Sequence, residues 1–584
     1  MPKIYIDGKP YEAENCKTVI ETAYANGLEI PHFCWHPELS VSGNCRMCLV
    51  EIGMPKRMPD GEIQKDENGD PVVNFFPKLQ IACATPISDG MRVRTKSDKA
   101  IEAQEAVTEF ILINHPLDCP ICDEAGECKL QEYAHKHSTG ISRFEEEKNH
   151  ADKRQRWGEH VYYDAERCIS CSRCIRYADE VADQKILSFV NRGDKVTIKK
   201  EEGKEWDNPY SMNVIEICPV GALTSADFRF KSRVWDMSFN DSISVADASG
   251  SNTKLGVRNN EILRVDPRTN PFVNRYWLSD DARLNHYKFV NENRLTEPMV
   301  DGNEVSWDDA ITAAFEKLKN YKPNEIMVLG SGKATNESNY MLARFAKEVL
   351  KTQNIDFLPH IDESFDDDFL GTADRLPNAT GAREVGIQSS GFKAEEIAQK
   401  ISIGQIKAFY VMEEDFSYHQ DMLDAFDKLD LLIVHAYNKT KLVEKAHIAF
   451  AAATYAESEG TFTNEKGRVQ HLTPALVTKE NLRYMGLKMS RLDKFGAFND
   501  RWMQHEQRNC RMSWRVIKDL ANKHGANWKL TSAKDVFADL SGKVQSFKGM
   551  DYKLLDKHQG VILGKADAPD PIVNNYESHR MKPE

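Results

Sequence analysis

The sequence predicts an α+β chain in two parts: small cysteine-rich domains come first, and a larger α/β region follows. The chain has 584 residues and 13 cysteines, and twelve of these thiols precede residue 219. From about residue 236 the pattern of apolar residues changes. Strand-like runs alternate with helix-like runs, which is typical of an α/β region with a parallel sheet. The strand-like runs are 326–329, 408–412 and 431–434, and the helix-like runs are 336–350 and 394–400.

Residues 1–95 predict a small β-rich domain with one helix. Strand-like runs at 4–6 and 11–13 flank a turn at Asp7–Gly8. Thr18 and Glu21 have the spacing of a capping box, which predicts a helix over about residues 19–26. Residues 53–71 are rich in Pro, Gly and charge and predict an exposed excursion.

Four further segments follow. Residues 96–150 predict helices, with an apolar set at Ile101, Val107, Phe110 and Ile111. Residues 151–235 predict short strands around the third group of cysteines. Residues 236–545 form the α/β region, and residues 546–584 are polar and predict an irregular tail.

Composition excludes some function classes. The formal net charge is −13, which argues against nucleic-acid binding through a broadly basic surface. No run of 18 apolar residues is present, and the start lacks the pattern of a secretory or transit peptide, so we expect a soluble protein. Thiols gathered as C-x-x-C predict metal sites in a reducing compartment, whereas Cys16 and Cys510 have no partner spacing and predict ordinary thiols.

The first candidate ligand set is Cys34, Cys45, Cys48 and Cys83. A [2Fe–2S] cluster needs four thiolates, and a tight loop around C-x-x-C lets backbone N–H groups point at the sulfurs. The distant Cys83 follows a strand-like run and would close the site from the sheet side. Four Cys with C-x-x-C also suit zinc, so both metals stay open here.

The second candidate set is His115, Cys119, Cys122 and Cys128. His115 stands four residues before a C-x-x-C, which favours its being a ligand over a capping or surface role. Three Cys and one His also fit zinc. In an iron–sulfur site, a neutral imidazole in place of a thiolate raises the reduction potential, as in Rieske centres.

The third candidate set is Cys168, Cys171, Cys174 and Cys218, with Pro219 after the last Cys. Three Cys at a period of three plus a remote Cys-Pro is the bacterial [4Fe–4S] ferredoxin pattern, which zinc sites rarely share. One such run predicts a single cluster. Arg167, Arg173 and Arg176 crowd this set, and we interpret them as offsetting the charge of the cluster rather than as solvated side chains.

The three sets, in this order, resemble the family of the large iron–sulfur subunit (the G-type subunit) of NADH:quinone oxidoreductase, respiratory complex I. The resemblance is carried by EIPHFCWHPELSVSGNCRMCLVEI, HPLDCPICDEAGECKLQ, CISCSRCIRY and ICPVGALTS. It continues through RVWDMSFNDSISVADASGSN, WLSDDARL, NRLTEPMV and EGTFTNEKGRVQ, to about residue 475.

The resemblance implies a fold and a function. The fold is a plant-type ferredoxin domain, a helical domain with one His and three Cys ligands, and a bacterial-ferredoxin-like domain. A molybdopterin-oxidoreductase-like α/β region without an active cofactor follows. The implied chain carries one [2Fe–2S] and two [4Fe–4S] clusters, with no molybdopterin and no flavin. Electrons would enter at the [2Fe–2S] set from an NADH/FMN-binding subunit, then pass through the Cys168–Cys218 set and the His115 set.

The same resemblance implies the surroundings. A ferredoxin-like subunit would take the electrons toward quinone, in the peripheral arm of a hetero-oligomeric complex on the cytoplasmic side of a bacterial inner membrane. Neither NADH nor quinone chemistry is expected in this chain, which lacks a G-x-G-x-x-G fingerprint after a strand. The chain is thus predicted to be an enzyme subunit without catalytic residues of its own.

Three features bear on the resemblance. Residues 330–350 resemble a molybdoenzyme motif, but NIDFLPHIDES brings no Cys after it, so a retained scaffold helix is expected. Residues 240–252 have no Cys, so the extra [4Fe–4S] cluster of some bacterial members should be absent. Residues 53–78 look like an insertion, either a hairpin or a subunit contact.

Two alternatives remain at this point. The same chain of iron–sulfur clusters occurs in NAD-linked hydrogenases and formate dehydrogenases. Electron-transfer subunits of the hydrogenases usually lack the long C-terminal region, and a formate dehydrogenase would need the metal-ligating Cys that is missing after residues 330–350. A zinc-stapled scaffold without a redox role is an alternative of another class, and the third set argues against it.

Overall fold

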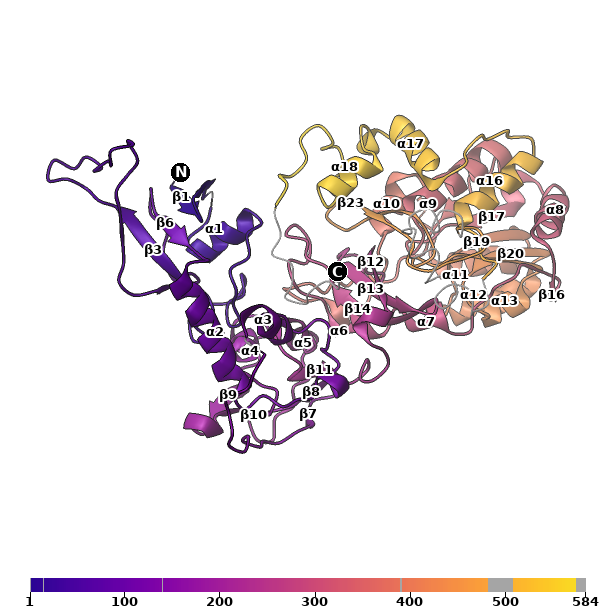
Figure 1. Ribbon diagram of the computed structural model, residues 1–584. Helices are drawn as coiled ribbons and strands as arrows, with labels where there is room; N and C mark the ends of the chain where they lie inside the picture. The colour runs from indigo at the N-terminus through magenta and orange to yellow at the C-terminus, as the bar shows by residue number, and fades with distance from the viewer. Residues whose placement is uncertain (1, 14, 139, 389–390, 482–507, 574–584) are drawn as a thin grey trace. The chain divides into compact units, whose positions relative to one another are not determined.

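The computed structural model describes residues 2–13, 15–138, 140–388, 391–481 and 508–573 (Figure 1). The chain forms two compact units, and the division falls between Asp236 and Met237. Within the described residues, no helix has the length and apolar character needed to cross a bilayer.

The first unit begins with a mixed sheet. Its strand order is β2-β1-β6-β3-β4, and β5 also pairs with β3. The predicted helix is α1 (Val19–Ala25), and its capping box is confirmed because Thr18 and Glu21 bond to each other's backbone N–H groups. The strands are β1 (Lys3–Ile6), β2 (Lys9–Glu12), β3 (Leu49–Pro55), β4 (Val73–Phe75), β5 (Gln80–Ile81) and β6 (Arg92–Arg94).

The excursion at residues 53–71 is a hairpin extension of this sheet. Strand β3 runs into it and β4 returns antiparallel, with Gly53 opposite Phe75. Isolated bridges join Arg57 to Ile63 and Lys65 to Pro71. Figure 1 shows this segment leaving the sheet beyond β3, and most of its side chains are exposed. The insertion therefore folds as a hairpin.

The helices predicted for residues 96–150 are α2 (Asp98–Leu112) and α3 (Lys129–His137). The apolar set is not the buried face of α2, because Ile101 is 38% exposed and Phe110 is 77% exposed. The buried residues of α2 are Ala100, Gln104 and Thr108, so small and polar side chains make the close contact.

The rest of the first unit surrounds the third cysteine set. An antiparallel sheet has the order β11-β8-β7, and β9 and β10 form a separate hairpin. The elements are β7 (Gln155–Trp157), β8 (Val161–Tyr163), α4 (Arg173–Glu180), β9 (Leu187–Val190), β10 (Thr197–Lys200), α5 (Asn213–Ile217) and β11 (Leu223–Ser225). Short 3₁₀ turns are η1 (Cys119–Ile121), η2 (Gly193–Lys195) and η3 (Val234–Asp236).

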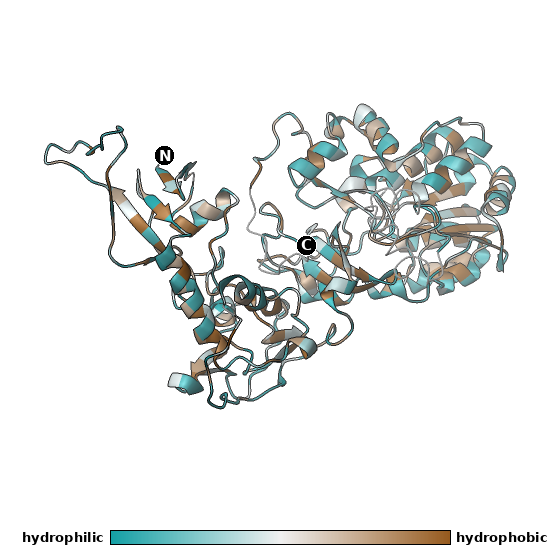
Figure 2. Cartoon of the chain, in the orientation of Figure 1, coloured by the Kyte–Doolittle hydropathy of each residue, from teal (hydrophilic) through white to brown (hydrophobic). Residues whose placement is uncertain are grey.

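The second unit contains the predicted parallel sheet. The strand order is β16-β15-β21-β20-β19-β17-β18, and the five strands from β21 to β18 run parallel. Figure 2 shows apolar residues concentrated on these strands, whose side chains are buried on both faces. The strands are β15 (Met299–Val300), β16 (Asn303–Glu304), β17 (Ile326–Leu329), β18 (Ile355–Asp356), β19 (Ala408–Met412), β20 (Leu431–Ala436) and β21 (Ile448–Ala451).

Helices complete the core of this region. Apolar residues of α8, α9, α16 and α17 join the strands in one buried cluster. The helices are α6 (Asp280–Leu284), α7 (Lys288–Asn291), α8 (Trp307–Leu318), α9 (Asn336–Arg344), α10 (Ala379–Glu384), α11 (Ala394–Ser402), α12 (Gln420–Ala425), α13 (Lys441–Lys445), α16 (Ser513–Lys523) and α17 (Ala533–Lys543). The shorter turns are η4 (Pro323–Glu325), a π-helical turn η5 (Phe345–Leu350), η6 (Glu363–Phe365), η7 (Phe426–Lys428) and η8 (Gln545–Phe547).

Two antiparallel sheets accompany the parallel one. The sheet β12-β13-β14 is formed by the first strands of the unit. The sheet β22-β23-β24 includes a strand, β24, that lies about 90 residues after β23 in the sequence. Their strands are β12 (Ser238–Ile243), β13 (Asn252–Arg258), β14 (Glu261–Pro267), β22 (Gly460–Thr463), β23 (Arg468–Leu472) and β24 (Val561–Ile562).

The prediction of an irregular tail over residues 546–584 is wrong for its first part. Helix α18 (Tyr552–Lys557) begins at an Asp551 cap, and β24 pairs with β23. The prediction failed because it relied on the polar composition of the segment. Two apolar residues within it, Leu555 and Val561, are buried in the core. Residues 574–584 lie outside the described part of the chain.

Candidate metal centres

The first set is gathered by the pairing of β5 with β3. The loop between α1 and β3 carries Cys34, Cys45 and Cys48, while Cys83 follows β5. Because Leu49 pairs with Ile81, and Ala82 N donates to Cys48 O at 2.9 Å, Cys83 arrives beside the loop. The thiols of Cys45 and Cys83 hydrogen-bond to Cys34 and hold the pKa of Cys34 well below its usual value. The structure therefore brings these four thiols together.

The second set lies between α2 and α3. Cys119 begins η1 and is exposed, Cys122 is buried, and Cys128 precedes the first residue of α3. Burial raises the pKa of Cys122 to about 11 and that of Cys128 to about 12, so these thiols stay protonated until a cation offsets their charge. Burial lowers the pKa of His115 to about 4, which keeps its imidazole neutral, the form that binds metal.

His115 shares its surroundings with this set through Arg167. The charge of Arg167 acts both on His115 and on Cys122. Arg167 is itself held by Asp118, with Nη2 at 2.9 Å from Oδ2. His115, Cys122 and Asp118 are thus all within electrostatic reach of one guanidinium.

The third set lines a cavity. Cys168 and Cys171 precede α4, Cys174 lies in its first turn, and Cys218 follows α5. The four thiols share the cavity with Ile169, Ile198, Val220, Ala222 and Leu223, and with Tyr163 and Arg173. Burial first, and then the charges of neighbouring thiols, raise the pKa of Cys174 and of Cys218. An apolar cavity with four convergent thiols suits an iron–sulfur cluster, which supplies the missing positive charge.

The chemistry of all three sets fits iron–sulfur ligation. Backbone N–H groups bond to sulfur in each of them. Phe33 N lies 3.5 Å from Cys45 Sγ, Ser170 N lies 3.4 Å from Cys168 Sγ, and the backbone of Glu124 bonds to Cys122. Such bonds stabilise thiolate sulfur in clusters. Within the described residues, no group of three or more His, Cys, Asp or Glu is arranged to hold a single metal ion.

The first and third sets meet along a polar seam. Side chains and backbone of the loop at residues 34–48 bond to the loop and helix at residues 168–180. The bonds are Ser40 N to Glu180 Oε2 at 2.8 Å, Asn44 Nδ2 to Ser170 O at 3.1 Å, and Ser172 Oγ to Ser42 Oγ at 3.2 Å. These contacts fix one ligand loop against the other.

The second and third sets meet at Gly221. A Cβ atom on Gly221 would stand 2.1 Å from Cys122 Sγ and 3.0 Å from Glu124 Cβ, so only glycine fits between them. Nearby, Lys129 N donates to Pro219 O at 3.2 Å. The chain after Cys218 is therefore packed directly on the Cys122 loop.

The three arginines are engaged with the protein. Arg173 is fully buried and donates to Ile217 O at 3.0 Å and to Trp35 O. Arg167 binds Asp118, and Arg176 donates to Cys34 O. The alternative of merely solvated side chains is thus excluded, and their effect on cluster charge stays a prediction.

Sequence reasoning missed a buried pair beside these sets. Lys129 Nζ lies 3.3 Å from His32 Nε2, and both residues are buried. Burial lowers the pKa of Lys129 to about 7. The sequence signal that could have found this pair is the position of each residue next to a ligand: His32 lies two residues before Cys34, and Lys129 follows Cys128.

The two thiols outside the three sets are placed separately. Cys16 is half-buried, and Cys510 is buried next to Arg294.

The strand–loop–helix motif of residues 330–350 is closed by the protein's own side chains. Ser331 N donates to Asn339 Oδ1 at 3.3 Å, and Asn339 Nδ2 returns a bond to Ser331 O at 2.8 Å. A Cβ on Gly332 would stand 2.7 Å from Leu376 Cβ. Lys333 is paired with Glu414 at 3.3 Å. The loop thus offers no vacant cradle for the phosphates of a pterin cofactor.

Helix α9 of this motif carries a buried carboxyl, Glu337. It accepts bonds from Thr461 N at 2.8 Å and from Tyr552 Oη at 2.8 Å. Burial raises the pKa of Glu337 to about 7, against an ordinary value of 4.5. The native state therefore holds a proton that the unfolded chain releases.

This proton predicts a pH dependence of stability. The contribution of Glu337 is greatest below about pH 4.5 and is lost as pH rises toward about 7, a loss of about 3 kcal/mol. Hydrogen–deuterium exchange of α9 and β22, corrected for intrinsic rates, should show this loss of protection in the wild-type chain and not in Glu337→Gln. An identical pH profile in the two proteins would contradict the assignment.

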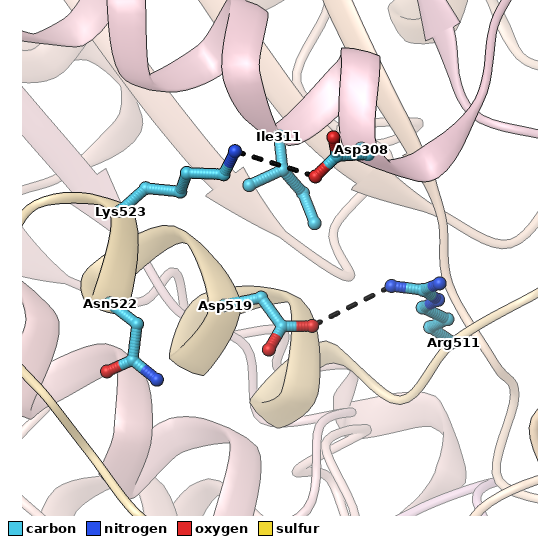
Figure 3. A pocket seen from close by; sticks show the side chains of 6 residues that line it. All are labelled: Asp308, Ile311, Arg511, Asp519, Asn522 and Lys523. Carbon is cyan, nitrogen blue, oxygen red and sulfur yellow. Dashed lines mark ion pairs between the residues drawn. The ribbon is translucent and has the colours of Figure 1, made fainter.

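A separate cavity of about 430 Å³ lies beside α8 and α16 (Figure 3). Its charged side chains face one another in pairs: Lys523 lies 3.5 Å from Asp308, and Arg511 lies 3.7 Å from Asp519. Because each charge is matched within the cavity, the site selects neither an anion nor a cation.

Family models match almost the whole first unit. A 2Fe-2S iron-sulfur cluster binding domain matches residues 2–98. The NADH-ubiquinone oxidoreductase-G iron-sulfur binding region matches residues 104–143, and the ferredoxin-like domain of NADH-quinone oxidoreductase subunit 3 matches residues 158–224. The three matches contain the first, second and third sets respectively.

Curated relatives match about three fifths of this chain. The G-type subunit of the Rickettsia bellii NADH-quinone oxidoreductase is 38% identical over 353 residues, which is 60% of this chain and 48% of that relative. The chain is a homologue of this NADH-quinone oxidoreductase subunit. Subunit 3 of the Thermus thermophilus NADH-quinone oxidoreductase is 36% identical over 61% of this chain and 47% of its own length.

A further relative comes from plant mitochondria. It is the mitochondrial NADH dehydrogenase [ubiquinone] iron-sulfur protein 1 of Solanum tuberosum, 38% identical over 60% of this chain and 45% of its own length. The chain thus spans about half the length of the curated relatives it matches. Among solved structures, a chain of an NAD⁺-reducing [NiFe]-hydrogenase aligns at 26% identity with a TM-score of 0.32, covering 40% of this chain and 91% of that one.

Two further models match the second unit. A 4Fe-4S domain of the NDSU1/NuoG-like type in NADH-ubiquinone oxidoreductase matches residues 238–286, and the molybdopterin oxidoreductase model matches residues 294–375 and 371–484. The fold class predicted from the sequence is therefore confirmed. The stretch matched by the 4Fe-4S model contains β12, β13 and β14 and has no Cys.

Proposed function

We propose that this chain is an iron–sulfur electron-relay subunit of NADH:quinone oxidoreductase. It would receive single electrons from an NADH/FMN-binding subunit and deliver them to a ferredoxin-like subunit on the quinone side. The observation that carries the proposal is the contiguity of the three ligand sets: the third set contacts the first along the polar seam and the second at Gly221. A scaffold stapled by zinc would not need its metal sites to touch.

The proposed ligands are the four residues of each set. One [2Fe–2S] cluster and two [4Fe–4S] clusters, when bound, supply one-electron redox chemistry. The [2Fe–2S] ligands are Cys34, Cys45, Cys48 and Cys83; the ligands of one [4Fe–4S] cluster are His115, Cys119, Cys122 and Cys128; and those of the other are Cys168, Cys171, Cys174 and Cys218.

The contacts of the third set with both others support the proposed order, in which the third set is the intermediate site between the first and second sets. The apolar side chains of its cavity exclude water, which strengthens every charge interaction inside it. The pairs Asn44–Ser170 and Ser42–Ser172 fix the separation of the first and third sets.

The second unit takes no part in redox chemistry under this proposal. Its strand–loop–helix motif is filled by Asn339, Leu376 and the Lys333–Glu414 pair, which supports the absence of a molybdopterin. The thiol-free stretch at residues 238–286 supports the absence of a fourth cluster. NADH and quinone chemistry would belong to partner subunits in the peripheral arm, on the cytoplasmic side of a bacterial inner membrane.

Metal and sulfide analysis of anaerobically purified protein tests the proposal. Three clusters predict about ten irons and about ten labile sulfides, with no molybdenum, and EPR signals of three clusters after dithionite reduction. About fourteen irons would reveal a fourth cluster. Stoichiometric zinc without sulfide, in a colourless protein, would overturn the electron relay.

The ligand assignment of His115 has its own test. In His115→Cys an anionic thiolate replaces a neutral imidazole, so the oxidised cluster is stabilised and the midpoint potential of the second site falls. A redox titration followed by EPR measures the shift, and the signals of the other two sites serve as internal controls. An unchanged potential would argue that His115 is not a ligand.

A further inference from the structure

One guanidinium, that of Arg176, reaches both the first and the third ligand sets. Arg176 lies in α4, two residues after Cys174. Its Nη2 donates to Cys34 O at 2.5 Å and to Cys171 O at 3.5 Å. Cys34 and Cys171 belong to different sets, so a single cation bonds to the backbone of a ligand from each.

The remaining donors of Arg176 fix its orientation. Nη1 donates to Ser40 O, and Nε donates to Ser172 Oγ at 3.2 Å. Ser172 Oγ in turn donates to Ser42 Oγ at 3.2 Å. All three nitrogens of the planar fork are therefore engaged across the seam. A lysine cannot reproduce this, because its ammonium is a compact charge on a flexible stem.

We propose that Arg176 is a positioning residue that locks the two ligand loops together and places one positive charge beside both sites. The inference rests on the proposed function, because the sites matter to each other only if both hold clusters. A cation close to a redox centre stabilises its reduced, more negative form and so raises its midpoint potential. Arg176 would raise two potentials at once and keep the sites at a fixed separation.

The arrangement distinguishes Arg176 from its neighbour Arg173. Arg173 is fully buried and donates to Trp35 O and Ile217 O, carbonyls of residues adjacent to ligands. Arg176 is half-buried and bonds to the ligand residues themselves. Removing Arg173 would leave buried acceptors unpaired and endanger the fold. Arg176 is itself half-buried, and one of its acceptors, Ser40 O, belongs to an exposed residue.

The test compares Arg176→Gln and Arg176→Lys in the full chain with its metal sites loaded. In Arg176→Gln both midpoint potentials shift to more negative values, and hydrogen exchange speeds up in the loops at residues 40–48 and 168–172. Arg176→Lys keeps the charge but not the fork, so the potentials shift less while the loops lose the same protection. Arg192→Gln, which changes an exposed arginine of the same unit, leaves both readouts as in the wild type.

Each outcome decides the proposal. Wild-type potentials in Arg176→Gln, or a shift in only one of the two, would overturn the shared role. Wild-type loop protection in Arg176→Lys would contradict the proposal that Arg176 joins the two ligand loops. If Arg176→Gln does not assemble its clusters, the potentials and loop exchange of Arg176→Lys test the proposal instead. If the wild-type chain itself binds no iron and sulfide, the proposed function fails instead, and loop exchange still reports whether Arg176 joins the loops.

Discussion

Replacement of Cys171 by alanine is expected to abolish one [4Fe–4S] cluster and to block electron flow from NADH to quinone in the assembled complex. Cys171 is one of four thiols that line the third cavity, whose other walls are mainly apolar. No described side chain in that lining can replace it as a thiolate, so the cluster loses a quarter of its protein ligands. Iron content should fall by about four atoms per chain, and one EPR signal should disappear.

The matched control is Cys16→Ala, since Cys16 is a half-buried thiol of the same unit outside all three sets. It should retain three signals and full iron content. Normal turnover of the assembled complex with Cys171→Ala, despite loss of the signal, would place the third site off the electron path. That result would contradict the proposed intermediate position of the third site in the relay.

Local rules explain why much of the fold could be predicted. The capping box of Thr18 and Glu21 forms because both residues satisfy backbone donors within one turn, so no distant contact is needed. The parallel strands could be recognised because burial on both faces leaves continuous apolar runs, as in β19 and β20. The ligand sets could be recognised because cluster geometry imposes short spacings on thiols.

What escaped prediction depends on contacts between distant segments. The apolar residues Ile101 and Phe110 predict a helix correctly, yet they are exposed, because spacing cannot tell which face the rest of the chain covers. The tail was expected to be irregular, but Val561 finds a partner strand at Val469, 92 positions earlier in the chain by its numbering. The contacts of Arg176 and Gly221 span two ligand sets, and neither has a spacing motif.

Gly221 gives the second large expected effect. Gly221→Ala should disrupt the second site although the change adds only one methyl group. The new Cβ would lie 2.1 Å from Cys122 Sγ and 3.0 Å from Glu124 Cβ, so the Cys122 loop must move away. Moving Cys122 Sγ far enough to relieve this clash is incompatible with the fixed geometry of a cluster. Loss of the EPR signal of the second site, with the [2Fe–2S] signal retained, is the expected result.

Gly542→Ala is the control for this change, because nothing lies within 4 Å of a Cβ at that position in α17. There the added methyl should leave all three signals intact and slightly favour the helix, by at most about 1 kcal/mol. An undisturbed second site in Gly221→Ala would mean that the Cys122 loop has room to retreat. Cys122 would then not be held against the segment after Cys218, and the direct contact between the second and third sites would no longer support their place as neighbours in the relay.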